Sequence, residues 1–258
     1  VLDVQRPAAE ITLDGIVLSF GGVRAIDDFS LTIRRGEVHG LIGPNGAGKT
    51  TTLNVISGYY RPEAGQARVG AHDLLSGTPE SRAQQGIART FQTPRLAGEA
   101  SVLDNVMVGG MVRGRGSFVE SMFSLPRHRR DEAMLRRHAS AALRVVGLEA
   151  LADVRADRLQ HSELRFVEIA RALMASPAFL LLDEPAAGLS TEEIARLGTL
   201  ITAIARHNVG VLLVEHHADL ICEICDRVSV LNLGRELASG TPAEIRAHKE
   251  VVSAYLGA

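Results

Sequence analysis

Short apolar runs alternate with amphipathic segments along most of the chain, and this alternation predicts the fold class. Residues 179–182 and 211–214 are apolar throughout, as in strands buried on both faces of a parallel sheet, and residues 38–42 predict a third buried strand. A helix is predicted after Ser190, because apolar side chains then recur at three- and four-residue intervals. Strands that alternate with helices indicate an α/β core with a mostly parallel sheet.

The first part of the chain has the two-residue period of half-buried strands. Alternation over residues 11–20 predicts one strand with a break near Gly15, and alternation over residues 29–33 predicts a second. Two glycines at 21–22 mark the turn between them, and a short strand is expected at 66–69. These segments predict an antiparallel β subdomain on the N-terminal side of the core.

The pattern becomes helical in the middle of the chain. Ser101 has the form of a helix cap, and residues 133–146 predict an amphipathic helix. We therefore expect a single domain with a helical subdomain at about residues 93–163, inserted between about 1–92 and 164–258 of the core. The core is expected to resume with a helix that begins at residue 164.

Composition limits the function classes. The 258 residues carry a net charge of −2, so bulk charge gives no reason to expect direct binding of nucleic acid. No apolar run approaches the ~18 residues that a membrane span requires, and no signal peptide is apparent. We expect a soluble protein. Cys222 and Cys225 form a lone C-x-x-C motif, which is interpreted as two core residues and not as a zinc or redox site.

The segment GPNGAGKT at residues 43–50 fits the phosphate-loop pattern G-x-x-x-x-G-K-[ST] between a predicted strand and a predicted helix. Glycines allow successive backbone N–H groups to point at one anion, and the helix N-terminus adds partial positive charge. Lys49 supplies a full charge for the β- and γ-phosphates, and the Thr50 hydroxyl can bind Mg²⁺. The loop therefore predicts a site for a nucleoside triphosphate.

Further polar residues follow the predicted strands. Asp183 and Glu184 end the apolar run, at the sheet edge where open α/β sheets bind ligands. Asp183 suits a residue that holds Mg²⁺ through a water, and Glu184 suits a general base. His216 ends the next buried strand and can reach a γ-phosphate, and the Gln92 amide can bind Mg²⁺ or a water.

The order of these motifs resembles ABC transporter ATPase subunits over essentially the whole chain. The motifs are the phosphate loop, Gln92, LQHSE at 159–163, LLLDEP, AGLS at 187–190 and His216. The segments ARTFQTPRL, SVLDNVMVGG and EIARALMASPAFLLLDEPAAGLS, with the terminal AYLG, most resemble the longer ATPase subunit of branched-chain amino-acid importers. The resemblance implies a P-loop NTPase fold, ATP and Mg²⁺ as cofactors, and ATP hydrolysis coupled to transport.

The resemblance also carries residue roles. It implies that Phe20 stacks on adenine, that Thr50, Gln92 and Asp183 hold Mg²⁺, and that Glu184, His216 and Gln92 are catalytic. The phosphate-loop residues that it assigns to nucleotide binding are Gly43, Asn45, Gly46, Ala47, Gly48, Lys49, Thr50 and Thr51. The second nucleotide-contacting segment is Gln160, His161, Ser162 and Glu163, where the family usually has Leu-Ser-Gly-Gly-Gln over 159–163. Gln160 and Ser162 replace the two residues that contact the γ-phosphate.

Partners and location follow from the same resemblance. It implies a second ATPase subunit, identical or different, bound head to tail, and integral membrane permease subunits at the cytoplasmic face of the plasma membrane. A solute-binding protein would act only through the permease. Alternatives are the ATPase of another ABC system, such as a lipopolysaccharide-export or urea/amide system, and an ABC ATPase that acts on nucleic acid or ribosomes. Whether the chain is a free subunit or part of a permease–ATPase polypeptide stays open.

Residues 113–138 carry seven arginines and three acids. We interpret this basic stretch as a solvated helical face. The alternative is a surface that meets anionic lipid headgroups or the permease.

Overall fold

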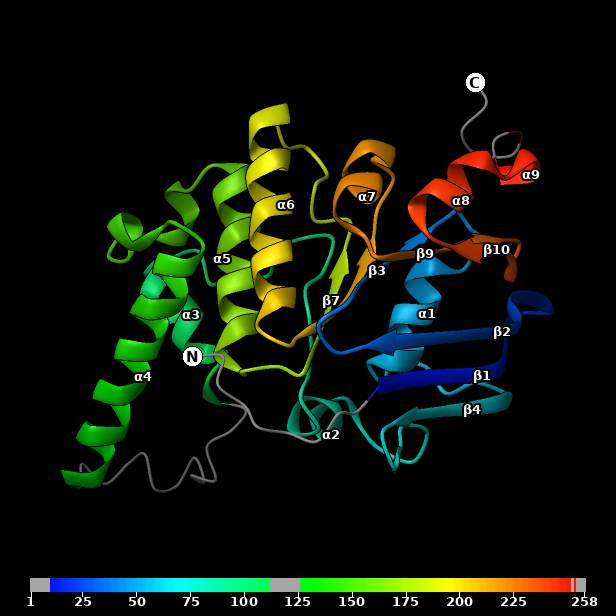
Figure 1. Cartoon of the computed structure of the whole chain (residues 1–258). Coiled ribbons are helices and arrows are strands. Elements are labelled where there is room, and N and C mark those ends of the chain that lie inside the picture. The colour runs from blue at the N-terminus through cyan, green and yellow to red at the C-terminus, as the bar shows by residue number, and fades with distance from the viewer. Residues whose placement is uncertain (1–9, 112–125, 252, 254–258) are drawn as a thin grey trace. The chain divides into compact units, whose positions relative to one another are not determined.

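The computed structural model describes residues 10–111, 126–251 and 253 (Figure 1). The chain forms two compact units. The core unit comprises the described residues of Val4–Gln92 and Ala178–Ala258, and the helical unit comprises those of Thr93–Pro177. The helical unit thus extends past the expected boundary at 163.

The core unit contains a six-stranded sheet whose strands are parallel except for one edge pair. The order across the sheet is β10 (Arg235–Gly240), β9 (Arg227–Asn232), β3 (Val38–Ile42), β8 (Gly210–Val214), β7 (Phe179–Asp183) and β6 (Ile87–Arg89). Only β10 pairs antiparallel, with β9. The three buried strands expected from apolar runs are β3, β7 and β8, and all their residues are buried.

A second, antiparallel sheet has four strands. Their order is β2 (Val23–Arg34), β1 (Glu10–Phe20), β4 (Ala64–Val69) and β5 (His72–Asp73). The expected break near Gly15 is a β-bulge inside one strand, because Gly15 has φ 58° and the pairing register shifts between Leu13 and Ile16. The prediction that the second strand begins at residue 29 is wrong, since β2 pairs with β1 from Val23 onward.

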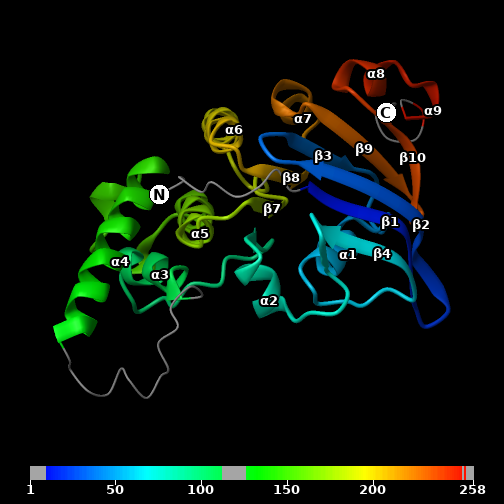
Figure 2. The ribbon, with the colours of Figure 1, turned by 60° about the horizontal axis from the view of Figure 1, so that its bottom comes forward.

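Helices of the core unit pack on both faces of the six-stranded sheet. α6 (Thr191–Arg206) and α7 (Ala218–Ile224) lie on one face, and α1 (Lys49–Ile56) and the four-stranded sheet lie on the other (Figure 1 and Figure 2). Shorter helices are α2 (Pro79–Gln84), α8 (Pro242–Ala247) and α9 (Lys249–Val251). The predicted cap of α6 is confirmed: the Ser190 side chain accepts a hydrogen bond from the Glu193 N–H.

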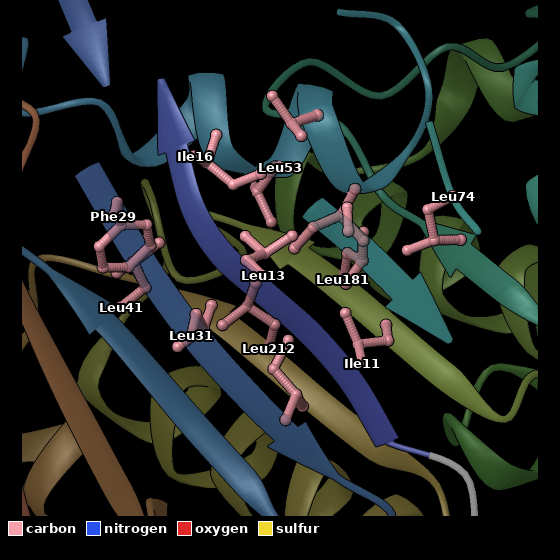
Figure 3. Packing of buried hydrophobic residues seen from close by; sticks show 14 of the residues in the cluster. Ile11, Leu13, Ile16, Phe29, Leu31, Leu41, Leu53, Leu74, Leu181 and Leu212 are labelled. Atoms are coloured by element: carbon pink, nitrogen blue, oxygen red, sulfur yellow. The ribbon is translucent and has the colours of Figure 1, made fainter. Parts of the chain in front are cut away.

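The main hydrophobic cluster joins the two sheets through α1. Figure 3 shows Leu13 of β1 with Leu53 of α1 and Leu181 of β7, all of which are almost fully buried. Burying a leucine side chain of this size contributes about 1.5–3 kcal/mol. This packing holds the start of α1, and the loop before it, against both sheets.

The helical unit contains α3 (Val102–Val108), α4 (Pro126–Val145) and α5 (His161–Met174), and short 3-10 turns at Glu149–Leu151 and Ala156–Arg158. The expectation that residue 164 opens a core helix is wrong. α5 begins at His161 and packs against α3 and α4, and the buried Glu168 accepts hydrogen bonds from the Arg95 N–H and the Arg171 side chain.

The start of α4 also differs from the prediction. The helix begins at Pro126 rather than near residue 133. The prediction missed its first turns because their charged sequence, PRHRRD, shows no apolar stripe. Of the basic stretch, residues 112–125 lie outside the described part of the chain. Residues 132–138 are almost all exposed on α4, as expected of a solvated helical face.

Candidate nucleotide-binding site

The phosphate loop connects the end of β3 to the start of α1, as its sequence predicts. Two of its glycines are required by close packing. A Cβ atom at Gly43 would lie 2.0 Å from the Leu231 carbonyl oxygen, and one at Gly48 would lie 2.5 Å from the Ala25 carbonyl oxygen. Their φ angles of 149° and 108° also favour glycine. The loop can therefore fold tightly beneath the helix N-terminus.

Asn45, Gly46 and Thr50 of the loop are exposed to solvent. Gly46 has φ 78°, and no described atom lies within 4 Å of the position that its Cβ would occupy. Asn45 and Thr50 are exposed, Thr51 is half-buried and Ala47 is buried. Glycine at 46 therefore leaves open space beside the loop, where backbone N–H groups can approach an anion.

Lys49 supplies the positive charge of the loop. Its side chain is buried, and Nζ donates hydrogen bonds to the carbonyl oxygens of Gly43, at 2.7 Å, and Pro44, at 2.9 Å. Burial lowers the pKa of Lys49, and the nearby carboxylates of Glu184 and Asp183 oppose that shift. The acid pair predicted at the end of β7 therefore lies close enough to Lys49 to act on its charge.

Asp183 is the last residue of β7 and is 2 % exposed. Its Oδ2 accepts a hydrogen bond from Arg89 Nη2 at 2.9 Å. Burial raises the pKa of Asp183, and the Arg89 guanidinium opposes the increase. The Gln92 amide also lowers this pKa, but Oδ1 is left without a well-formed hydrogen bond to any described residue. A buried carboxylate oxygen of this kind fits a hydrated Mg²⁺ ion.

Glu184 adopts φ 48°, a sparsely populated conformation for a residue with a side chain. Its backbone N–H donates to the Val214 carbonyl, and its Oε1 lies 2.8 Å from His216 Nε2. The structure therefore brings Glu184 and His216 into hydrogen-bond contact.

The buried carboxylate of Glu215 connects the loop after β7 with the loop after β8. Glu215, 1 % exposed, accepts hydrogen bonds from the backbone N–H groups of Ala186, at 2.6 Å, and His216, at 2.9 Å. Glu215 therefore ties the loop after β7 to the loop after β8. Glu215 directly follows the apolar run at 211–214, and no role was predicted for it from the sequence.

The remaining predicted residues lie in two places. Phe20, on the core unit, is 46 % exposed and makes an edge-to-face contact with Tyr60 at 5.0 Å between ring centroids. Its exposed ring is available to a planar base. Gln160, His161, Ser162 and Glu163 lie at the N-terminus of α5 in the helical unit, where the Gln160 N–H donates to Glu163 Oε2 at 2.8 Å. Gln160 and His161 are exposed.

Arg89, within the segment ARTFQ at residues 88–92, was not predicted as a site residue from the sequence. The Arg89 side chain is 6 % exposed and contacts the Asn54 and Ser57 side chains as well as Asp183. A buried arginine between two elements has no local sequence signal, because its partners come from distant parts of the chain.

Other features lie away from this site. A hollow of about 690 Å³ is lined by residues of both sheets, among them Thr32 of β2, Gln66 of β4 and Ser229 of β9, and none of the residues assigned to the nucleotide line it. Cys225 is buried, Cys222 is half-buried, and no group of three potential metal-binding His, Cys, Asp or Glu residues occurs in the described part of the chain. Within that part, every helix is too short or too polar to span a membrane.

A phosphate loop at the β3–α1 junction, with an acid pair at the end of β7 beside its lysine, defines a P-loop nucleoside triphosphatase. Residues 26–187 match the ABC transporter family, and residues 235–258 match a branched-chain amino acid ATP-binding cassette transporter family. The chain belongs to the ABC transporter family. It is an ATP-binding protein of the ATP-hydrolysing kind.

Relatives cover nearly the whole chain. The high-affinity branched-chain amino acid transport ATP-binding protein BraF of Pseudomonas aeruginosa is 38 % identical, over 98 % of this chain and 99 % of BraF. The corresponding protein LivG of Escherichia coli is 36 % identical, over 96 % of this chain and 97 % of LivG. A solved nucleotide-free ATP-binding cassette from an ABC transporter is 30 % identical, covers 97 % of this chain and all of that cassette, and has a TM-score of 0.84.

Proposed function

We propose that this chain powers an importer for branched-chain or closely related amino acids. The observation that carries the proposal is the full-length match to BraF and LivG, together with the family match at residues 235–258. A putative ribose/galactose/methyl galactoside import ATP-binding protein of Burkholderia cenocepacia is 34 % identical to this chain, but this chain spans only 46 % of its length. The branched-chain systems therefore agree with this chain in length as well as in sequence.

The residues of the core unit suit the hydrolytic step. Lys49 and the N-terminus of α1 bind the phosphates, and Phe20 stacks on the adenine. Glu184 accepts a proton from the attacking water, and the hydrogen bond from His216 orients its carboxylate. Mg²⁺, when bound, neutralises charge on the β- and γ-phosphates. Thr50, Gln92 and Asp183 would hold it.

The subunit works with partners in this proposal. A second ATPase subunit, bound head to tail, places its own segment at Gln160–Glu163 against the γ-phosphate. Integral membrane permease subunits couple closure of the pair to solute movement, so the chain lies at the cytoplasmic face of the plasma membrane. The solute-binding protein contacts the permease, and this chain does not bind nucleic acid.

Nucleotide titration tests the assigned site. Lys49→Ala removes the ammonium and should weaken ATP binding at least about tenfold. Glu184→Gln keeps the size of the side chain but cannot accept the proton, so ATP affinity should persist while turnover falls at least about 100-fold. An unchanged dissociation constant for Lys49→Ala, or parental turnover for Glu184→Gln, would reject the assignment.

Transport by the assembled complex tests the solute class. The subunit is reconstituted in proteoliposomes with its permease and solute-binding protein, and with ATP on the side of the ATPase. Uptake of labelled leucine, isoleucine or valine is expected, and uptake should be absent with Glu184→Gln. ATP-driven uptake of ribose without uptake of these amino acids would contradict the proposal while leaving the ATPase assignment intact.

A further inference from the structure

One buried arginine connects three parts of the core unit. Arg89 is the last residue of β6, three residues before Gln92, and its side chain is 6 % exposed. Nη2 donates to Asp183 Oδ2 at 2.9 Å. Nη1 donates to Asn54 Oδ1 at 2.6 Å and to Ser57 Oγ at 3.1 Å. The guanidinium therefore joins the end of α1 to the carboxylate at the end of β7.

The planar shape of the guanidinium explains how one side chain reaches all these acceptors. Its N–H groups point in fixed directions, so an arginine can hold a carboxylate on one nitrogen and two neutral oxygens on the other. The ring of Phe91 lies 5.0 Å from the guanidinium carbon and adds a cation–π contact. The contacts hold Arg89 from more than one side, and through it they hold Asp183.

The contact uses only one of the two Asp183 oxygens. Oδ2 accepts from Arg89, whereas Oδ1 is buried and has no well-formed hydrogen bond to a described residue. A carboxylate fixed in this way keeps Oδ1 in one orientation. Outer-shell groups that orient a metal-binding carboxylate typically change metal affinity by about 10–100-fold when they are removed.

We propose that Arg89 is a positioning residue that orients Asp183 for Mg²⁺ and links it to helix α1 and to the segment that leads to Gln92. The proposal rests on the proposed Mg²⁺ site. Because Arg89 joins these elements through side-chain contacts, a shift of the segment at residues 89–92 changes the orientation of the metal-binding carboxylate. This coupling distinguishes Arg89 from a buried ion pair that only stabilises the fold.

The test compares nucleotide affinity with and without metal. The dissociation constant of a fluorescent, non-hydrolysable ATP analogue is measured on the purified full chain, once with saturating Mg²⁺ and once with EDTA. For Arg89→Met, the affinity gained from Mg²⁺ should fall about tenfold or more, while the metal-free affinity changes less than about twofold. Arg89→Lys keeps the charge, but its single ammonium nitrogen cannot reproduce the spacing of the two guanidinium nitrogens that contact Asp183 and helix α1, so an intermediate loss is expected.

Control variants separate positioning from folding. Arg82→Met removes another buried arginine of the same unit, on α2. It should leave the increase in nucleotide affinity on adding Mg²⁺, here called the Mg²⁺ gain, unchanged. Asn54→Ala keeps the arginine but removes one of its partners, and it should reduce the Mg²⁺ gain in the same direction. If Arg89→Met does not fold, Arg89→Lys and Asn54→Ala carry the test.

Two results would overturn the proposal. An unchanged or larger Mg²⁺ gain in the Arg89 variants would show that the arginine does not orient Asp183 for the metal. Equal weakening with and without Mg²⁺ would show a structural role only. Asp183→Asn identifies failure of the underlying assignment: if that variant keeps the full Mg²⁺ gain, the proposed metal site is wrong, whatever Arg89 does.

Discussion

Alanine at Gly48 and at Gly46 should separate folding from nucleotide binding within one loop. Gly48 has φ 108°, and a Cβ there would lie 2.5 Å from the Ala25 carbonyl oxygen and 3.0 Å from a methyl carbon of Leu231. The backbone oxygen cannot rotate away as a side chain could. Gly46 has φ 78° and open space around its Cβ position among the described atoms. The methyl group of Gly48→Ala would therefore clash with the protein, whereas that of Gly46→Ala would occupy the open space beside the loop.

The two costs differ in origin. A left-handed conformation costs a residue with a side chain about 1–2 kcal/mol, and this applies to both positions. Overpacking adds about 1–3 kcal/mol at Gly48 alone. Gly48→Ala should therefore lower the free energy of unfolding by about 2–5 kcal/mol, and Gly46→Ala by about 1–2 kcal/mol.

Urea unfolding without nucleotide, followed by circular dichroism, measures this difference, and the midpoint should fall further for Gly48→Ala. A fluorescent ATP analogue then gives the affinity of the folded variants. Gly46→Ala should lose most of its nucleotide affinity, because its Cβ takes up space that the phosphates need. Equal midpoint shifts for both variants, or parental nucleotide affinity for Gly46→Ala, would refute this account of the loop.

Three further substitutions test other parts of the structure. Glu215→Ala leaves the buried N–H of Ala186 and the partly buried N–H of His216 without their acceptor. Urea unfolding should therefore show a loss of about 1–3 kcal/mol in the free energy of unfolding, and ATPase assays should show a fall in turnover that exceeds the fall in ATP affinity. Hydrogen bonds from Arg235 and Arg24 lower the pKa of Asp27 from 3.8, so its contribution to stability is present above that pH and is lost as the pH falls through the folded-state pKa. Asp27→Asn should therefore unfold with a shallower pH dependence below about pH 4, and an unchanged acid-unfolding curve would count against this. Ser162→Gly should raise turnover in the assembled transporter without changing ATP affinity of the free chain, because glycine allows closer approach to a phosphate; flat or lower turnover would mean that Ser162 already makes a good contact.

Elements with strong local signals were predictable from the sequence. The strands β3, β7 and β8 are continuous apolar runs, and the cap at Ser190 follows a short sequence rule. The phosphate loop combines a strand, a glycine-rich turn and a helix start within a few residues. In each case, the residues that determine the structure are neighbours in the chain.

Elements that depend on distant partners were not predictable in the same way. β9 and β10 were not assigned, and β10 is mostly exposed, so it lacks a clear apolar pattern. The start of α4 was misplaced because its first turns carry only charged and polar residues after Pro126. The helical unit was ended too early because no local pattern shows which unit α5 belongs to, and its place is decided by packing on α3 and α4.

The candidate site shows the same division at the level of side chains. Lys49, Asp183 and Glu184 were found because motifs place them beside the loop, but the partners that hold them are not visible in any motif. Lys49 donates to the carbonyl oxygens of its own loop, Asp183 accepts from Arg89, and Glu184 pairs with His216. Each charged group therefore has a protein partner already.

Under the proposed assignment, nucleotide binding at Lys49 must exchange one set of hydrogen-bond partners for another rather than add contacts to a free charge. For Lys49 the exchange is favourable, because neutral carbonyl acceptors are replaced by charged phosphate oxygens, and charge-assisted hydrogen bonds are roughly twice as strong. For Asp183 no exchange is needed under the proposed Mg²⁺ assignment, since Oδ2 can keep Arg89 and Oδ1, which has no well-formed hydrogen bond to a described residue, would face a water of the metal. The contribution of Lys49 to affinity is thus a difference between two sets of hydrogen bonds, whereas Arg89 keeps its contact with Asp183 in both states and acts through the orientation of that carboxylate.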